Sequence, residues 1–120
     1  VLTHAIMDAL LGAAALGDIG RHFPPGDPRY KDISSLTLLA KVKDLIGAKG
    51  WQVNNVDATI IAERPRLSEH IDQMRQKLCQ TLDIEMPQVS IKASTSDGLG
   101  FTGRGEGIAA LAVASIKEKA

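Results

Sequence analysis

The residues with the clearest capacity for chemistry near the start of the chain are a histidine and an aspartate. His4 and Asp8 are four positions apart, so on a helix they lie on one face. An imidazole binds zinc well, and a carboxylate one turn away could orient it by a hydrogen bond. A zinc site needs three or four ligands, however, and no partner motif accompanies the pair. From spacing alone, a surface histidine–aspartate pair is favoured over a metal site.

A second carboxylate, Asp18, lies in a glycine-rich segment after the expected end of the same helix. There it could accept hydrogen bonds from two hydroxyls of a sugar, although alone it is better interpreted as a turn residue. The segment that follows contains Pro24, Pro25 and Pro28. Because three prolines forbid a helix and stiffen the chain, this loop would lose little entropy on binding a ligand.

Hydroxyl and carboxylate side chains cluster late in the chain, directly after a predicted strand. They are Ser94, Thr95, Ser96 and Asp97. Hydroxyls and free backbone N–H groups at a strand end can hold phosphate oxygens, and Asp97 could hold a divalent cation. The alternative is a polar turn. The G-x-G-x-x-G spacing at 98–103 does not indicate dinucleotide binding, because too little chain remains for a βαβ unit.

Arginines and the one cysteine give weaker signals. Arg64, Arg66 and Arg104 could bind phosphate with their guanidinium groups, although most arginines are solvated surface residues. Cys79 falls beside Leu78 on the apolar side of a predicted helix, which favours a core residue over a nucleophile. A lone cysteine forms no intrachain disulfide and indicates a reducing compartment.

The elements that must position these residues follow from hydrophobic periodicity and from the glycines and prolines. The pattern predicts helices and strands alternating in one small core, which is an α+β or α/β arrangement. The apolar run 108–116 fits both a helix and a strand buried on both faces. Gly17 is the predicted stop of the first helix, and the second helix, which Ser34 or Ser35 can cap, is closed by Gly47 and Gly50. The other predictions are helices over 2–16, 34–47 and 68–82, strands over 51–61 and 89–93, and loops over 17–32 and 94–107.

Composition limits the class of protein. The chain has 120 residues, enough for one domain, and 14 basic residues balance 14 acidic ones. A net charge of zero argues against non-specific binding of nucleic acid, and aromatic residues at 3% argue against a base-stacking surface. The longest apolar run is too short to cross a membrane as a helix, so no membrane partner is expected.

Four stretches that are each weak signals form a specific pattern when they are taken in order. The stretches are Ala9–Gly20, Phe23–Pro28, Asn55–Pro65 and Gly100–Gly107. In this order and spacing the chain resembles the 2-C-methyl-D-erythritol 2,4-cyclodiphosphate synthase family, over essentially its whole length.

The resemblance implies a fold and an assembly. The expected subunit is α+β, a ferredoxin-like sandwich with one mixed sheet, and 108–116 becomes a strand. Three subunits would form a homotrimer around a threefold axis, with an active site at each interface. Residues 1–120 would be a single synthase domain that lacks the family's N-terminal strand, Asp-x-His motif and mobile loop, since Val1 opens the chain without methionine and within a helical pattern.

The resemblance also implies an activity. Members of the family convert 4-diphosphocytidyl-2-C-methyl-D-erythritol 2-phosphate into 2-C-methyl-D-erythritol 2,4-cyclodiphosphate and release CMP. The expected protein is thus a phosphorus–oxygen lyase of non-mevalonate isoprene biosynthesis, in a bacterial cytoplasm or a plastid stroma. The alternative is a trimeric module that binds nucleotides or isoprenoid phosphates without catalysis.

Finally, the resemblance assigns roles to residues. His4 would be one zinc ligand, with two more in the Asp-x-His motif upstream. Asp97 would hold Mg²⁺ or Mn²⁺, although the family usually has Glu there, and the Thr95 hydroxyl would stabilise the transition state. The implied substrate-binding residues are Asp18, Ile19, Gly20, Phe23, Pro24, Pro25, Gly26, Asp27, Ala62, Glu63, Arg64, Pro65, Arg66, Leu67, Ser68, Ser94, Thr95, Ser96, Asp97, Phe101 and Arg104.

Overall fold

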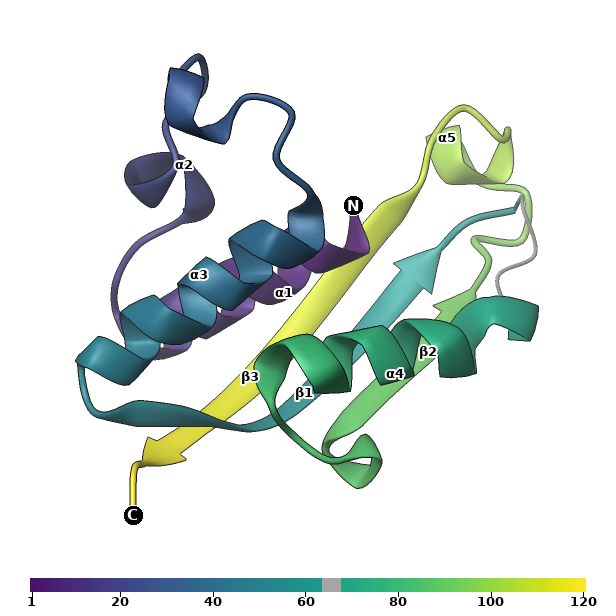
Figure 1. The fold of residues 1–120 in the computed structure, drawn as a ribbon. Coiled ribbons are helices and arrows are strands. Elements are labelled where there is room, and N and C mark those ends of the chain that lie inside the picture. Colours follow the sequence, from purple (N-terminus) through teal and green to yellow (C-terminus); the bar gives the residue numbers. More distant parts are fainter. Residues whose placement is uncertain (64–67) are drawn as a thin grey trace.

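The computed structural model describes residues 1–63 and 68–120, which form a mixed three-stranded sheet with helices on one face (Figure 1). The α+β class and the single mixed sheet are as predicted, and the ferredoxin-like comparison stays a prediction. No helix among the described residues is long and apolar enough to span a membrane. The elements in chain order are α1 (Leu2–Ala13), α2 (Ile19–His22), η1 (Pro28–Tyr30), α3 (Ser35–Ala48), β1 (Trp51–Ile61), η2 (Ser68–His70), α4 (Ile71–Leu82), η3 (Met86–Gln88), β2 (Val89–Ser94), α5 (Gly100–Gly103) and β3 (Ala109–Glu118).

The sheet is built around β1, which lies between β2 and β3. β1 pairs with β2 in parallel, from Val56 opposite Val89 to Ile61 opposite Ser94. It pairs with β3 in antiparallel, which confirms that the ambiguous C-terminal run is a strand. Because parallel strands end at the same edge of a sheet, the segments after Ile61 and Ser94 begin side by side.

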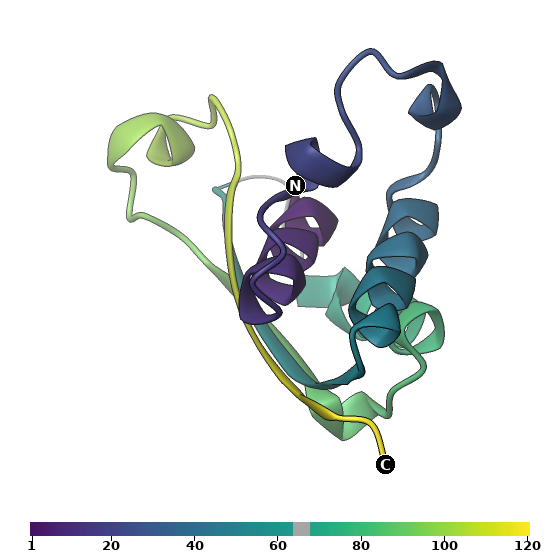
Figure 2. The same cartoon turned by 90° about the vertical axis from the view of Figure 1, so that its left-hand side faces the viewer.

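The core lies between the sheet and its helices. Alternate side chains of β1 point to the helical face and are buried there, while the other face of the sheet carries no helix (Figure 2). This alternation is the period-2 pattern of a strand with one covered face. The most deeply buried side chains are Ile6, Met7, Leu10, Leu11, Leu39, Val42, Ile46, Val56, Leu82 and Val89.

The first helix ends earlier than its apolar spacing predicts. α1 stops at Ala13, and Ala15 takes a left-handed conformation with φ of 57°. The Leu16 N–H then donates to the Leu11 carbonyl at 2.8 Å, closing the end of the helix. Leu16 still packs against the core, but from the turn and not from the helix. The predicted stop at Gly17 was wrong because an alanine adopts the left-handed position.

The predicted loops contain short helices. Residues 17–32 hold α2 before the prolines, and η1 begins at Pro28, where the missing N–H costs nothing. α5 lies in the predicted loop 94–107, and α3 continues through Gly47 to Ala48. Ser34 caps α3 as predicted, since its hydroxyl accepts from the Thr37 N–H at 3.1 Å.

We expect Leu39→Ala to lower the free energy of unfolding by about 2–5 kcal/mol, because Leu39 is fully buried on α3 and its truncation leaves a cavity. Urea denaturation followed by circular dichroism measures the change. Lys41→Ala, at an exposed position of the same helix, is the control and should alter stability by less than about 0.5 kcal/mol. Equal effects of the two substitutions would contradict this packing.

Candidate functional site

A groove of 760 Å³ brings together residues that are distant in the sequence. His4, from the first turn of α1, lies on one wall, and the segment from α2 to Lys31 forms most of the rest, together with Leu38 of α3. All but one of the candidate residues between positions 18 and 27 line this groove. They are Ile19, Gly20, Phe23, Pro24, Pro25, Gly26 and Asp27. The structure therefore joins the candidate metal ligand to the stiff proline loop in one concave surface.

Aromatic packing shapes the loop side of the groove. The rings of Phe23 and Tyr30 meet edge to face, with centroids 5.0 Å apart. Both residues pack partly against the core. The loop between them is therefore closed on itself and held to the body of the protein, in addition to the restraint from its prolines.

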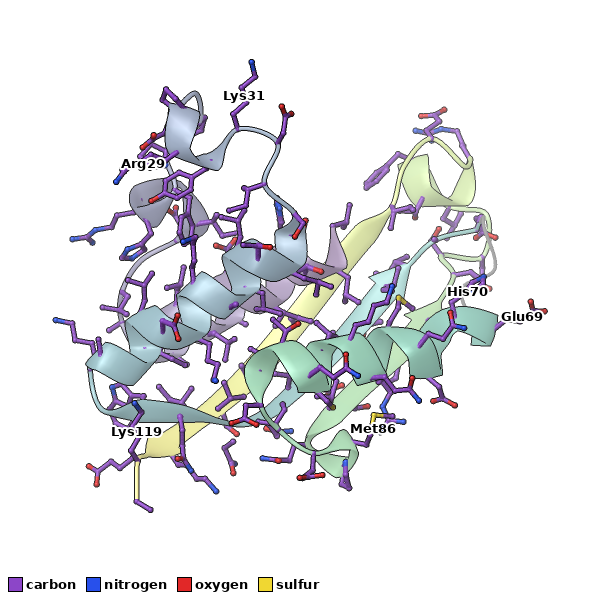
Figure 3. All side chains as sticks on the ribbon, viewed as in Figure 1. Arg29, Lys31, Glu69, His70, Met86 and Lys119 are labelled. Atoms are coloured by element: carbon purple, nitrogen blue, oxygen red, sulfur yellow. The ribbon has the colours of Figure 1, made fainter. Side chains whose placement is uncertain are left out.

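The Asp27 carboxylate makes its hydrogen bonds within its own turn. Its carboxylate caps η1 by accepting from the Arg29 N–H at 3.0 Å and pairs with the Arg29 guanidinium at 2.8 Å. These hydrogen bonds lower the pKa of Asp27 and raise the pKa of Arg29. Arg29 points away from the loop in Figure 3, whereas Lys31 also lines the groove. Asp27 thus lines the groove as an ionised group whose charge Arg29 offsets.

The two carboxylates near α2 have distinct partners. Asp18 caps α2, because its Oδ1 accepts from the Arg21 N–H at 3.1 Å, as the turn interpretation predicts. Asp8 Oδ1 accepts from the Ile19 N–H at 2.9 Å. The Asp8 carboxylate therefore binds the backbone of the loop, and its role in orienting His4 stays a prediction.

A second cluster of polar residues lies where β1 and β2 end. The Ala62 N–H donates to the Ser94 carbonyl at 3.0 Å, which extends the pairing of the two strands by one residue. Beyond it, Glu63 Oε1 accepts from the Gly98 N–H at 3.1 Å. The start of the 62–68 segment and the 94–98 loop are therefore held together.

Thr95 and Asp97 contact each other inside this loop. The Asp97 N–H donates to Thr95 Oγ1 at 3.1 Å, and the same hydroxyl lies 3.4 Å from Asp97 Oδ1. Both residues are exposed. Asp97 adopts a positive φ of 55°, which an aspartate tolerates better than most residues. The hydroxyl and the carboxylate therefore face solvent together, where a ligand can reach both.

Two residues that the sequence analysis did not single out support this loop from α5. Thr102 is buried, and its hydroxyl donates to Ser96 Oγ at 2.8 Å, which in turn donates to the Leu99 carbonyl at 2.6 Å. A side chain at Gly103 would place its Cβ 2.1 Å from the Gly98 carbonyl carbon. The glycines of 98–107 were the available signal: Gly103 allows close backbone packing, whereas Gly98, Gly100 and Gly105 take positive φ angles.

The remaining candidates are on the surface or outside the described residues. Arg104 pairs with Glu106 at 2.8 Å, and the Phe101 ring is about half exposed. Arg64 to Leu67 lie outside the described part of the chain, as does the side chain of Ser68. Cys79 is buried, which raises the pKa of its thiol, so it is a core residue as predicted.

The two clusters lie at one end of the molecule but stand apart. α2, beside the groove, and α5, beside the 94–98 loop, are on opposite sides of this end in Figures 1 and 2. Within residues 1–63 and 68–120, no group of three histidine, cysteine, aspartate or glutamate side chains could hold a metal ion. His4 therefore does not complete a zinc site with the other described side chains.

Residues 1–117 match the model of the YgbB family. The chain belongs to the YgbB family. Among curated proteins, a YgbB relative from Dehalococcoides mccartyi named 2-C-methyl-D-erythritol 2,4-cyclodiphosphate synthase is 61% identical over 99% of this chain and 76% of its own length. A synthase of the same name from Desulforamulus reducens is 55% identical over 98% of this chain and 75% of its own length.

Solved structures share this YgbB fold. The bifunctional IspDF of Campylobacter jejuni superposes with a TM-score of 0.93 at 36% identity, over 98% of this chain and 32% of that chain. IspF of Plasmodium falciparum, solved as a CDP complex, superposes with a TM-score of 0.85 at 30% identity, over 98% of this chain and 70% of that chain. The family resemblance predicted from the motifs is confirmed.

We expect Gly103→Ala to displace the 94–98 loop of this YgbB protein. A methyl group 2.1 Å from a backbone carbon cannot be accommodated by a side-chain rotation, so the substitution should destabilise the fold by about 1–3 kcal/mol. Hydrogen exchange of residues 95–99 and urea denaturation measure the effect. The matched control is Gly12→Ala in α1, where the added Cβ meets nothing within 4 Å and should stabilise the helix by about 0.5–1 kcal/mol. Unchanged exchange in Gly103→Ala would contradict the packing of α5 on the loop.

Proposed function

We propose that the protein converts 4-diphosphocytidyl-2-C-methyl-D-erythritol 2-phosphate into 2-C-methyl-D-erythritol 2,4-cyclodiphosphate and CMP. The observation that carries this proposal is the convergence of His4 and seven residues of 19–27 on one groove. It is supported by 61% identity, over nearly the whole chain, to a relative named for this reaction. With this activity, the protein would act in isoprene biosynthesis as a cyclising lyase.

The substrate would extend across both clusters. The 62–68 segment would hold the cytosine, largely through backbone groups, and the 94–97 loop would hold the diphosphate. Asp18, Ile19 and Gly20 would contact the ribose and erythritol hydroxyls, and 23–27 would line the erythritol pocket. The solved CDP complex of the Plasmodium falciparum protein supports a cytidine-linked ligand. Arg104 and Phe101 would lie near the substrate from α5.

The reaction joins two groups that repel each other. An oxygen of the 2-phosphate attacks the β-phosphorus, a new P–O bond forms, and the bond from the β-phosphorus to the bridging oxygen breaks as CMP leaves with the electron pair. The attacking phosphate is already ionised at neutral pH, so the protein needs no general base for it. What the chain must supply is orientation of the two ends and hydrogen bonds to the developing charge. The Thr95 hydroxyl is exposed in the diphosphate loop and would donate one of them.

The described residues fit Mg²⁺ or Mn²⁺ better than they fit zinc. Mg²⁺ or Mn²⁺ is commonly held by one or two carboxylates together with substrate phosphates, and the exposed Asp97 carboxylate fits that role. When bound there, the cation would neutralise charge on the phosphate oxygens. For zinc, His4 would be one ligand, and the described residues do not provide the two more that a site needs. No step of the reaction is therefore derived through zinc.

The open face of the sheet supports a homotrimer. On β3, Val113 is 72% and Leu111 is 65% exposed, although both are large apolar residues in a strand. They lie opposite Asp57 and Thr59 of β1. Because their neighbours Ala112 and Ala114 pack against the core, Leu111 and Val113 point to the other face of the sheet, which none of the described helices covers (Figure 2). An exposed apolar strip beside polar residues is typical of a protein interface. Packing three such faces together would also let the groove of one copy approach the 94–98 loop of another, which joins the two halves of the site.

We expect Thr95→Ala to lower kcat by about 100-fold or more while changing KM little, because the hydroxyl acts on charge that develops only in the transition state. Release of CMP and ³¹P NMR of the cyclic product measure the reaction in the protein that carries this chain. Thr95→Ser keeps the hydroxyl and is the matched control. Binding of CDP by the unsubstituted protein without any turnover would favour the alternative, a binding module without catalysis.

We expect Val113→Asp to convert the trimer into monomers. Burying an unpaired carboxylate at each of three symmetric contacts costs several kcal/mol, so the concentration for half-assembly should rise by roughly 100-fold or more. Sedimentation equilibrium measures the mass. Lys41→Asp, on the exposed side of α3, is the control and should leave assembly unchanged. A monomeric unsubstituted protein would contradict the trimer.

A further inference from the structure

The segment from Gly17 to Phe23 has few means of holding its own conformation. α2 has four residues, too few to offset the entropy of starting a helix. None of these four side chains is buried, although Ile19 packs partly against the core. Its position beside the groove therefore depends on contacts from outside the segment.

Two polar contacts add to the packing of Ile19 and Phe23 against the core, and they act at opposite ends of the segment. His22 Nε2 lies 2.7 Å from the Leu16 carbonyl oxygen, which closes the segment on itself. Asp8 Oδ1 accepts the Ile19 N–H at 2.9 Å, and of these two contacts it is the one that reaches into the body of the protein. Asp8 belongs to α1, and Met7, Leu10 and Leu11 of the same helix are fully buried. The core therefore holds in place the backbone that carries the Asp8 carboxylate.

The backbone N–H that Asp8 binds lies at the start of α2. Ile19 is the first residue of α2, and the first N–H groups of a helix have no partner within it. Asp8 satisfies the one at Ile19, and Asp18 satisfies the one at Arg21. Asp8 thereby fixes where the Asp18 carboxylate and the Gly20 backbone stand relative to α1.

The same helix face carries His4. Asp8 is one turn from His4 on α1, and His4 lines the groove together with Ile19 and Gly20, whereas Asp8 does not line it. A single rigid helix thus sets the spacing between the imidazole and the loop. Removal of the Asp8 carboxylate would free the loop without removing any group from the groove wall.

We infer that Asp8 is a positioning residue for nucleotide binding: by holding the Ile19 N–H it sets the 18–20 segment in the position that grips the ribose or erythritol hydroxyls. This role rests on the proposed function for its ligand, but its structural half, the restraint of the 17–23 segment, does not. Asp8 touches no substrate in this arrangement and acts only through the loop backbone.

The test compares Asp8→Ala with Asp8→Asn, which keeps an acceptor oxygen at the same position. Hydrogen exchange of residues 17–23 without ligand reports the restraint, and calorimetric titration with CDP reports binding. We expect faster exchange and about tenfold weaker CDP binding in Asp8→Ala, since a hydrogen bond to a charged acceptor is lost, and recovery of most of both in Asp8→Asn. Asp44→Ala, an exposed helical aspartate on α3, is the matched control and should change neither. The melting temperature and the KM-to-kcat split separate loop positioning, which raises KM, from general destabilisation.

The outcomes divide clearly. Unchanged exchange of 17–23 in Asp8→Ala overturns the inference, whatever happens to binding. Faster exchange with unchanged CDP affinity overturns the positioning role while leaving the proposed function intact. Failure of the unsubstituted protein to bind CDP contradicts the proposed function instead, and the exchange of 17–23 then decides alone whether Asp8 restrains the loop.

Discussion

The parallel pairing of β1 with β2 is the constraint on which the rest of the candidate site depends. Ile61 and Ser94 are partners in this ladder, and the Ala62 N–H continues it by one more hydrogen bond. Two segments that are more than thirty positions apart are therefore released at the same point of one sheet edge. In the proposed function the first segment would bind the base and the second the diphosphate, which requires that they start together, and an antiparallel pairing would have placed them at opposite ends.

The covered face of the sheet then sets the position of the groove. α1 is buried along Ile6, Met7 and Leu10, so the helix cannot rotate without exposing them. Its outer face consequently carries His4 on the wall of the groove and Asp8 against the Ile19 N–H of α2. Burial of one face of α1 therefore fixes the direction of the side chains on its opposite face. Proline stiffness, the Phe23–Tyr30 contact and the Asp27–Arg29 pair complete the loop side.

The groove and the 94–98 loop stand apart in one copy of the chain, and this separation matters for a substrate that carries several negative charges. A substrate whose own phosphate groups repel each other must be held at both ends if those ends are to meet. One copy of the chain places α2, beside the groove, and α5, beside the 94–98 loop, on opposite sides of the same end of the molecule (Figure 1). The uncovered, apolar face of β3 offers a way to bring the groove of one copy to the loop of the next. The complete active site would then form only between assembled copies, so catalysis would require assembly.

Local patterns were sufficient for the elements and for the family. The β-branched and apolar residues of 51–61 predicted β1, and the two serines at 34 and 35 predicted the start of α3, because strand propensity and helix capping depend on neighbouring residues. Spacing alone could not predict that Ala15 ends α1, that Thr102 is buried beneath Ser96, or that Asp8 binds the Ile19 N–H. Each of these depends on which backbone N–H, hydroxyl or carbonyl lies nearby after the chain has folded. The sequence therefore determined which chemical groups are present and on which elements, whereas the tertiary structure decided their partners, because a hydrogen bond forms with the group that packing brings within reach.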